Sequence, residues 1–401
     1  MIQDVCGSRV DPSELRSPAF GLDPHPVYAR LRRTDPVHWN PLVRAWFVTR
    51  HADVVELLGE PWLTSRDSAA VVAAADPAVR AEVASVERFF GRWPVFTDPP
   101  RHGELRSLLR PAFARSVVEE SAGRVAGHAV RAVTALVGAS TPLDVVRDLA
   151  EPYALAVTAD FLGFAPTDLE ALRGWSTGLM AYLHTSPVDL ALLLATARTI
   201  DGFTAHVRDE VLPAGRGPVA AALRRARADG DITDTTAAAL MAQLLTGGVA
   251  PVATTIAAAV VQLRSGVDRG GSSTEDVVAE ALRRSTPFHH APRTVARDTT
   301  WRGHRFQAGQ RVALVLASAN RDPAVHTDPD SFVAGRGTGH VAFGRGAHHC
   351  LGAHLARRSV EALLRAVDAH APGLRVDAGG VRMSPAAGAT VFDRVPVERV
   401  R

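Results

Sequence analysis

The chain has 401 residues, of which 46% are hydrophobic and 22% are charged. These are the proportions of a folded globular protein, and they exclude a disordered chain, which holds fewer apolar residues and more net charge. The formal net charge of +3 is too small to indicate a nucleic-acid-binding protein.

The cysteines and the N-terminal residues bear on the cellular compartment. Cys6 and Cys350 are too few for a disulfide framework, which favours a reducing environment. Residues 1–15 include charged side chains and lack the apolar run of a secretion signal or an N-terminal anchor. We therefore expect a cytoplasmic protein that is not attached to a membrane.

The hydrophobic pattern predicts a mainly α-helical chain with small β regions near both ends, organised as a single domain of residues 1–401. The first part is expected to hold a helix over 26–33, a hairpin of strands 37–39 and 45–49, and a helix over 52–58. Three- and four-residue spacing then predicts helices over 105–114, 117–136, 145–162, 167–182, 188–210, 219–228, 235–263 and 275–284. Short strands at 292–297 and 310–316 and a helix from residue 351 to about 369 complete the prediction. Strands and helices do not alternate, which disfavours a doubly wound nucleotide-binding fold.

Residues 235–263 hold no charged side chain and consist mostly of Ala, Val, Leu and Ile. A run of this length is a candidate membrane span. It also contains Gly247, Gly248 and Pro251, and it lies between charged segments without an aromatic belt. We predict a long helix buried in the core, since helices that are apolar all round are buried.

Residues 343–352 read FGRGAHHCLG and form the most informative segment. Cys350 follows a glycine-rich stretch and precedes a predicted helix, whose N-terminal N–H groups and dipole stabilise a thiolate. Gly344, Gly346 and Gly352 let backbone amides and a flat ligand approach closely. A thiolate held in this way is a good axial ligand for haem iron.

Two other interpretations of this segment stay open on its residues alone. Cys350 can be a buried structural thiol, a common state for a lone cysteine. It can also join His340, His348, His349 and His354 in a zinc site, although the usual C-x₂-C pair is missing. Motifs elsewhere in the chain bear on the choice between haem, zinc and a structural role.

At every fixed position, residues 343–352 resemble the F-G-x-G-x-H-x-C-x-G signature of the cytochromes P450. Residues 280–283 (EALR), followed by Arg293 and Arg336, resemble the E-x-x-R region of that family, and residues 98–106 (DPPRHGELR) resemble its D-P-P-x-H-x-x-x-R motif. The resemblance runs from about residue 24 to the C-terminus. It implies the cytochrome P450 fold, a triangular helical prism around haem b (iron protoporphyrin IX), with Cys350 as the ligand of the iron.

The resemblance also implies roles for residues away from the cysteine. Four residues would donate charge-assisted hydrogen bonds to the two haem propionates: His102, Arg106, Arg293 and His348. Four others would lie against the haem: Phe343, Gly344, Gly352 and Gly248. A buried charge triad with a structural role would be formed by Glu280, Arg283 and Arg336.

One motif of the family is replaced in this chain. The helix on the oxygen side of the haem usually carries A/G-G-x-D/E-T, whereas residues 247–251 read GGVAP. The acid and the alcohol that organise proton delivery are thus replaced by Ala250 and Pro251, which carry no acidic proton. Proline also removes an N–H, so we expect the helix to open or kink there. Thr254 and Thr255 are candidates for partial compensation.

This replacement leaves two classes of reaction open. In the first, the enzyme is a monooxygenase of a specialised metabolite, and water or polar groups of the substrate deliver the protons. In the second, the reaction needs less proton delivery, as in oxidative coupling, ring formation or a peroxide-driven oxidation.

Substrate and electron partners are expected from the same resemblance. Phe288, His289, His290 and Ala291 should line the substrate pocket, and one of the two histidines is a candidate proton donor. The sequence holds no flavin or nicotinamide motif, so electrons should come from a ferredoxin and its reductase. Surplus arginines near the cysteine would suit an acidic partner: Arg101, Arg110, Arg345, Arg357 and Arg358. We expect a monomer that binds a small-molecule substrate.

Overall fold

The computed structural model describes residues 10–65, 68–139, 142–184, 189–266, 271–337, 339–386 and 388–399. It is mainly helical with small sheets, which confirms the predicted fold class. The helices of the first half are α1 (Pro18–Leu22), α2 (His25–Thr34), α3 (His51–Leu57), α4 (Ser68–Ala74), α5 (Arg80–Phe90), α6 (Arg101–Leu109), α7 (Arg115–Glu120), α8 (Ala122–Gly138) and α9 (Glu151–Leu162). Those of the second half are α10 (Leu169–His184), α11 (Leu190–His206), α12 (Leu212–Ala214), α13 (Pro218–Ala228), α14 (Asp234–Arg264), α15 (Thr274–Arg284), α16 (Leu316–Ala319) and α17 (Ala353–His370).

The strands form four small sheets. Their bounds are β1 (Val37–Asn40), β2 (Ala45–Val48), β3 (Leu63–Thr64), β4 (Leu143–Asp144), β5 (His290–Val295), β6 (Thr299–Trp301), β7 (His304–Phe306), β8 (Arg311–Val315), β9 (Leu374–Val376), β10 (Arg382–Met383), β11 (Phe392–Arg394) and β12 (Pro396–Arg399). The largest sheet has the order β1-β2-β8-β5-β3, in which β2 and β8 are parallel and the other pairs antiparallel. The others are β4-β12-β9, β10-β11 and β6-β7.

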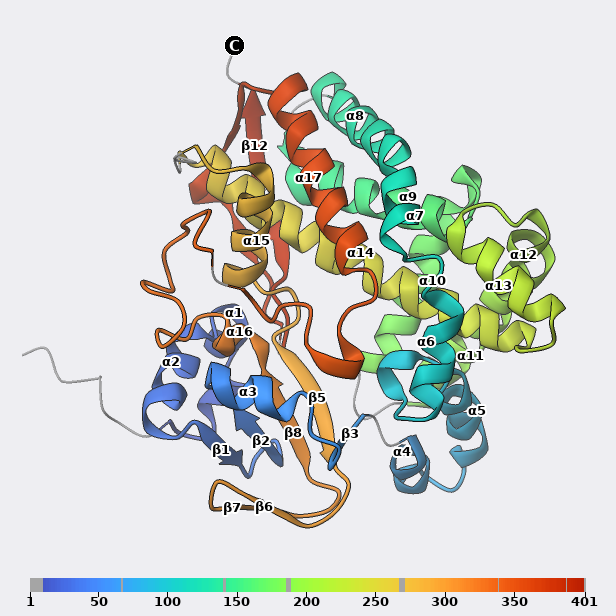
Figure 1. The fold of residues 1–401 in the computed structure, drawn as a ribbon, viewed down its shortest axis with the longest axis vertical. Coiled ribbons are helices and arrows are strands. Elements are labelled where there is room, and N and C mark those ends of the chain that lie inside the picture. The colour runs from blue at the N-terminus through green and yellow to red at the C-terminus, as the bar shows by residue number, and fades with distance from the viewer. Residues whose placement is uncertain are drawn as a thin grey trace, which may run out of the picture.

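Helix α14 runs across the middle of the helical part, and the largest sheet lies to one side of it (Figure 1). It contacts α9, α10, α11, α15 and α17. Its first half packs into a core with α10 and α11, and its second half into a core with α8, α9, α15 and α17. Among the described residues, α14 is the one helix long and apolar enough to span a membrane, but the protein itself buries most of it, as predicted.

Of the two outcomes expected at Pro251, an opening or a kink, the structure excludes the opening, because α14 is continuous from Asp234 to Arg264. Thr233 caps its start, with Oγ1 accepting a hydrogen bond from the N–H of Thr236 over 3.2 Å. Val252 and Ile256, on the turn after the proline, are buried in the second core. This packing holds the helix in place across the missing N–H of Pro251.

Several predicted elements have different bounds in the structure. The expected hairpin is present, with Val37 opposite Val48 and Asn40 opposite Ala45. The helix predicted over 105–114 spans Arg101–Leu109 and ends before Pro111, which cannot continue it. The helix predicted over 117–136 is divided at Ser121 into α7 and α8. The hairpin of β6 and β7 was not predicted.

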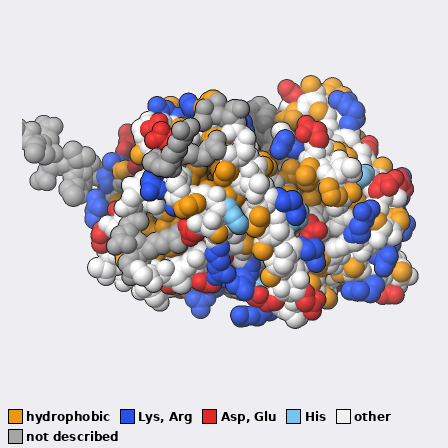
Figure 2. Space-filling view, turned by 90° about the horizontal axis from the view of Figure 1, so that it is seen from above, with side chains coloured by type: hydrophobic (Ala, Val, Ile, Leu, Met, Phe, Trp, Pro, Cys, Tyr) orange, Lys and Arg blue, Asp and Glu red, His pale blue; other side chains and the backbone are white. Residues whose placement is uncertain are grey.

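The surface carries charges of both signs. On the face seen from above in Figure 2, basic and acidic side chains are interspersed. This mixture agrees with the small net charge of +3.

Candidate functional site

The loop that carries Cys350 is folded by its own backbone. The N–H of Cys350 donates to the carbonyl of Phe343 over 2.9 Å, and the N–H of Gly344 donates to Val341 over 2.9 Å. Gly344 and Gly346 have φ angles of +67° and +71°, a left-handed conformation that favours glycine. These two glycines let the chain turn sharply within the loop. The loop ends at Cys350, just before the first turn of α17.

The thiol of Cys350 is exposed, although protein atoms crowd around it. Burial raises the pKa of this thiol, and the N–H of Gly352 and the charges of Arg106 and Arg357 oppose that effect. Cys350 lies just before the N-terminus of α17, a position that favours a thiolate. A metal cation at this position would displace the thiol proton, so the sulfur suits a metal ligand.

An accessible stripe runs along the otherwise buried helix α14. Gly247 and Ala250 are exposed, and Pro251 and Thr254 are half-buried. Their spacing of three and four residues places them on one face of the helix. The structure thus brings the three predicted oxygen-side residues Ala250, Pro251 and Thr254 together on this stripe.

Gly248, which was predicted to lie against the haem, is half-buried. A Cβ atom on Gly248 would lie 3.0 Å from Cγ2 and from Oγ1 of Thr158, so its lack of a side chain serves the packing of α14 against α9. A Cβ on Gly247 would meet nothing within 4 Å, and this glycine lies on the stripe. Its position three residues before Ala250 is the signal that could have identified it.

The hydroxyls expected to compensate for the missing alcohol already donate to the backbone. Oγ1 of Thr254 donates to the carbonyl of Thr390 over 3.2 Å. Oγ1 of Thr255, which is 2% exposed, donates to the carbonyl of Pro251 over 2.7 Å. In this arrangement neither threonine directs its proton toward the stripe.

The residues predicted to hold the propionates come together as a cluster of cationic and imidazole groups. The ring centres of His102 and His348 are 4.2 Å apart. Burial, Arg293, His102 and Arg106 lower the pKa of His348 to about 3. Burial and the charge of Arg106 likewise lower the pKa of His102, Asp98 opposes them, and Arg293 lowers it further.

This cluster has unused hydrogen-bonding capacity. Nε2 of His102 is buried and has no hydrogen-bond partner among the described residues. Arg293 is 8% exposed, and its Nη1 donates to the neighbouring carbonyl of Pro292 over 2.8 Å. Buried donors are normally paired, so a ligand with carboxylates fits this cluster. With the exposed sulfur of Cys350, the donor set fits haem.

Sequence reasoning missed Ser65 in this cluster. Its Oγ lies 3.3 Å from Nε2 of His348, and its N–H donates to both carboxylate oxygens of Asp98 over 3.0 and 3.1 Å. Asp98 belongs to the recognised DPP motif, but no pattern in the sequence marked Ser65.

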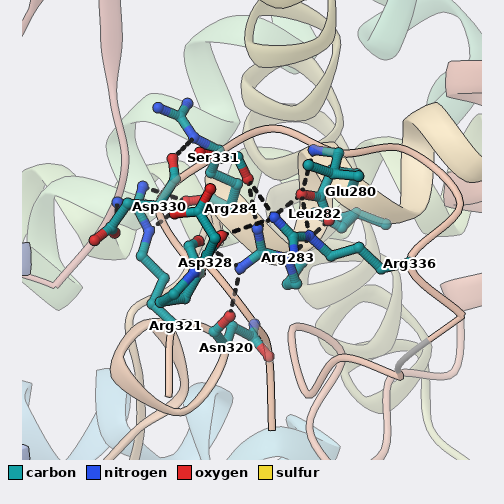
Figure 3. Close-up of polar contacts among 12 residues, drawn as sticks. Glu280, Leu282, Arg283, Arg284, Asn320, Arg321, Asp328, Asp330, Ser331 and Arg336 are labelled. Atoms are coloured by element: carbon teal, nitrogen blue, oxygen red, sulfur yellow. Dashed lines mark hydrogen bonds and ion pairs between the residues drawn. The ribbon is translucent and has the colours of Figure 1, made fainter. Parts of the chain in front are cut away.

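The three residues of the predicted charge triad lie together, with Glu280 and Arg283 buried and Arg336 half-buried (Figure 3). Arg283 donates to both carboxylate oxygens of Glu280 over 2.7 Å, and Nε of Arg336 donates to Oε1 of Glu280 over 2.9 Å. Burial alone would raise the pKa of Glu280, but these bonds and one from the N–H of Val333 hold it below its ordinary value. A capping box of Ser273 and Asp276 starts α15 and so positions Glu280 and Arg283.

The triad also holds the chain that leads to the cysteine loop. Nη1 of Arg283 donates to the carbonyls of Asn320 and Pro329, both over 2.8 Å. Nη2 of Arg336 donates to the carbonyls of Asp328 and Ser331, again over 2.8 Å. Since Oδ1 of Asn320 accepts the N–H of Val341 over 2.7 Å, this network reaches the segment just before residue 343.

The four residues expected in the substrate pocket have different environments. Phe288 is 44% exposed, and Ala291 is half-buried in β5 opposite Leu314. His289 is 2% exposed, with Nε2 lying 2.9 Å from Oγ1 of Thr390. Nε2 of His290 lies 2.8 Å from the hydroxyl of Tyr28, and burial lowers the pKa of His290 to about 4. Both histidines face internal partners, which argues against their predicted role as proton donors.

A zinc site at the cysteine loop finds no support. Within the part of the chain that the structure describes, no three His, Cys, Asp or Glu side chains are grouped to hold a metal ion. Nε2 of His354 lies 2.9 Å from Oε1 of Glu119, and His348 lies against His102 and Ser65.

Comparisons with known proteins agree with this geometry. A model of the family "Cytochrome P450" matches residues 273–367. Nocardicin C N-oxygenase of Nocardia uniformis subsp. tsuyamanensis is 30% identical, with 91% of this chain and 93% of the relative covered. Erythromycin C-12 hydroxylase of Saccharopolyspora erythraea is 29% identical, with 88% of each chain covered. The crystal structure of CalO2 has a TM-score of 0.84 and 26% identity, with 98% of each chain covered.

The chain belongs to the cytochrome P450 family, as its motifs predicted, and it has the cytochrome P450 fold. It is accordingly a monooxygenase-type oxidoreductase whose cofactor is haem.

Proposed function

We propose that this cytochrome P450 uses Cys350 as the axial ligand of its haem iron and oxidises a specialised metabolite. The observation that carries the proposal is the exposed Cys350, which follows the left-handed turns at Gly344 and Gly346 and lies just before α17. Thiolate-ligated haem, when bound, supplies dioxygen activation. The residues of the chain hold the haem, position the substrate and control the access of protons. One domain, comprising residues 1–401, carries out all of these tasks in this proposal.

Residues on both sides of the sulfur would hold the haem. His102, Arg106, Arg293 and His348 would bind its propionates by charge-assisted hydrogen bonds. Phe343, Gly344 and Gly352 would lie on the sulfur side, and Gly247 and Ala250 would line the opposite side. The network of Glu280, Arg283 and Arg336 would keep the cysteine loop in position.

The substrate would meet a largely apolar surface. Phe288 presents an exposed apolar side chain (44%), and the stripe of α14 adds the exposed Gly247 and Ala250 and the half-buried Pro251. Nocardicin C N-oxygenase and erythromycin C-12 hydroxylase are named for reactions on compounds of the specialised-metabolite class. These similarities support a specialised metabolite as the substrate.

Protons for the reaction would come from water or from the substrate. Ala250 and Pro251 carry no acidic proton, and Thr254 donates to Thr390. The same observation favours a second candidate function, an oxidative coupling or a peroxide-driven oxidation. Turnover of a panel of metabolites with dioxygen, ferredoxin and ferredoxin reductase should be compared with turnover in hydrogen peroxide alone. Hydroxylated product in the first mixture supports the monooxygenase, and product confined to the second supports the alternative.

Electrons would come from a ferredoxin and its reductase in the cytoplasm, with the enzyme acting as a monomer. Arg110 and Arg345 are exposed and suit an acidic partner. Arg358 is less available than expected, because it donates to Glu119 over 2.7 Å and to Glu361 over 3.0 Å. The reduction rate should fall as salt is added, and a rate independent of ionic strength would contradict electrostatic docking.

A further inference from the structure

A pocket lies at the C-terminal half of α14, beyond Thr254, the last residue of the accessible stripe. Its volume is about 200 Å³, which is below the roughly 300–1,000 Å³ of sites for drug-sized ligands. Its wall comes from the chain around α1 and α2, from α14, from the end of α15 and from the segment between β10 and β11. Its polar lining includes Gln262, Arg284, His25, His289 and Thr390.

One wall of this pocket holds polar groups without protein partners. Arg284 uses its Nε to donate to the carbonyl of Asp330 over 2.7 Å, and no described residue accepts from its two Nη groups. Nδ1 of His25 and Nδ1 of His289 are both buried without a hydrogen-bond partner in the described structure. Buried polar atoms of this kind normally have a partner, so this wall has capacity for a polar ligand.

Cationic groups act on the histidines of the same wall. Burial and then the charges of Arg321, His289, Arg32 and Arg284 lower the pKa of His25 well below its ordinary value. Burial, His290 and Arg321 lower the pKa of His289 to about 3. Asp23 is the acidic residue of the described wall, and its Oδ1 accepts the backbone N–H of His25 over 3.2 Å. Burial and the charge of Arg283 lower the pKa of Arg284, and the acidic groups Asp330, Glu280 and Asp23 only partly oppose them. A negatively charged group beside Arg284 would therefore favour its charged form.

The rest of the wall is apolar. Ala258 and Val261 of α14 lie on one side, and Met383, Val391 and Phe392 lie on the other. A ligand that satisfies both parts has an anionic head for Arg284 and a short hydrocarbon stem. A short-chain carboxylate has this chemistry, because a guanidinium binds a carboxylate through two parallel hydrogen bonds.

The pocket is related to the accessible stripe through α14. Ala258 and Gln262 follow Thr254 at four-residue intervals and so share its face of the helix. At 1.5 Å per residue, they lie roughly 10–18 Å along the axis from Ala250 and Pro251. Thr390 connects the stripe and the pocket. Its carbonyl accepts a hydrogen bond from Oγ1 of Thr254 on the stripe, and its own Oγ1 lies 2.9 Å from Nε2 of His289 in the pocket wall.

We propose that this pocket is a second ligand site, which binds a small carboxylate with an apolar stem through Arg284 and is separated from the reaction side by Thr390 and His289. The site does not depend on the role of Cys350.

Binding of hexanoate to the haem-loaded enzyme tests the proposal, by isothermal titration calorimetry together with the haem absorbance spectrum. Hexanoate should bind once per chain and more tightly than hexan-1-ol, without shifting the haem spectrum. Arg284→Gln should weaken hexanoate binding roughly tenfold or more, the loss expected for a charged hydrogen bond. Arg297→Gln is the matched control, because Arg297 is exposed and lies outside the pocket, and it should leave the affinity unchanged.

Three outcomes would overturn the proposal. These are no heat at millimolar hexanoate, equal affinity in Arg284→Gln, or binding that shifts the haem spectrum to the same extent in both proteins. The last would place the carboxylate on the reaction side. If Arg284→Gln does not fold, hexanoate binding to Gln262→Leu tests the site instead, because Gln262 lines the same pocket. The substitution should weaken binding several-fold, and an unchanged affinity would equally reject the site.

Discussion

Oγ1 of Thr255 donates a hydrogen bond to the carbonyl of Pro251 over 2.7 Å, one turn back along α14. The bond ties the proline to the buried side of the helix, and it occupies the hydroxyl proton of Thr255. The position of Pro251 therefore combines two properties, a helix that stays continuous and a stripe without a proton donor. The two can be tested separately.

Pro251→Ala should raise the free energy of unfolding by about 1–3 kcal/mol. Proline within a helix removes one backbone hydrogen bond and costs about 3 kcal/mol relative to alanine, of which the surrounding packing recovers a part. Urea unfolding of the haem-loaded protein measures the change. Pro251→Gly is the matched control and should gain about 1 kcal/mol less than the alanine variant. A fall in stability in Pro251→Ala would show that the proline itself supports the helix.

Arg283→Met should destabilise the protein by about 3–5 kcal/mol, because it leaves the buried carboxylate of Glu280 with one of its two charged partners. Arg283 is 1% exposed and also holds the carbonyls of Asn320 and Pro329. Arg297→Met, at an exposed position, should change the unfolding free energy by less than about 0.5 kcal/mol. Equal effects of the two substitutions in denaturant titrations would remove the structural role of the triad.

Glu280 should make the protein sensitive to acid. Its pKa in the folded state lies below the ordinary value of 4.5, because the bonds from Arg283, Val333 and Arg336 outweigh burial. The unfolded state thus binds the proton more readily, and the stability that Glu280 contributes is present above pH 4.5 and is lost as the pH falls through its folded-state pKa. Glu280→Gln should start from a lower stability and show a shallower decline from about pH 5 to pH 3. Parallel curves for the two proteins would contradict this assignment.

Removing a donor from the cationic cluster should weaken haem retention. Arg293→Leu and His102→Phe should each speed the transfer of haem to an acceptor protein roughly tenfold, since a hydrogen bond to a charged group contributes about 1.5–3 kcal/mol. Arg101→Leu is a suitable control, because Arg101 is exposed and pairs with Glu104 on the same helix. Transfer rates in the cluster variants that equal those of the control would exclude these residues as propionate ligands.

Residues in local motifs were the most predictable part of the site. The triad of Glu280, Arg283 and Arg336 was expected from a pattern of side chains, and the structure brings all three together. The continuity of α14 could not be predicted, because packing on both sides of Pro251 outweighs the local cost of proline. Ser65 was missed, since its contact with His348 joins positions 283 residues apart. The buried hydrogen-bond partner of His290 could not be predicted either, because it is Tyr28, which is 262 residues away in the sequence.

The most direct test of the account is the absorbance spectrum of the reduced, carbon monoxide-bound protein, recorded for the native chain and for Cys350→Ala. The account predicts that the native protein absorbs near the wavelength for which the family is named, because a thiolate ligates its iron. Cys350→Ala should lose that band even where haem analysis shows that it still binds haem. A band of the same position and height in Cys350→Ala would contradict the assignment of Cys350 as the ligand of the iron.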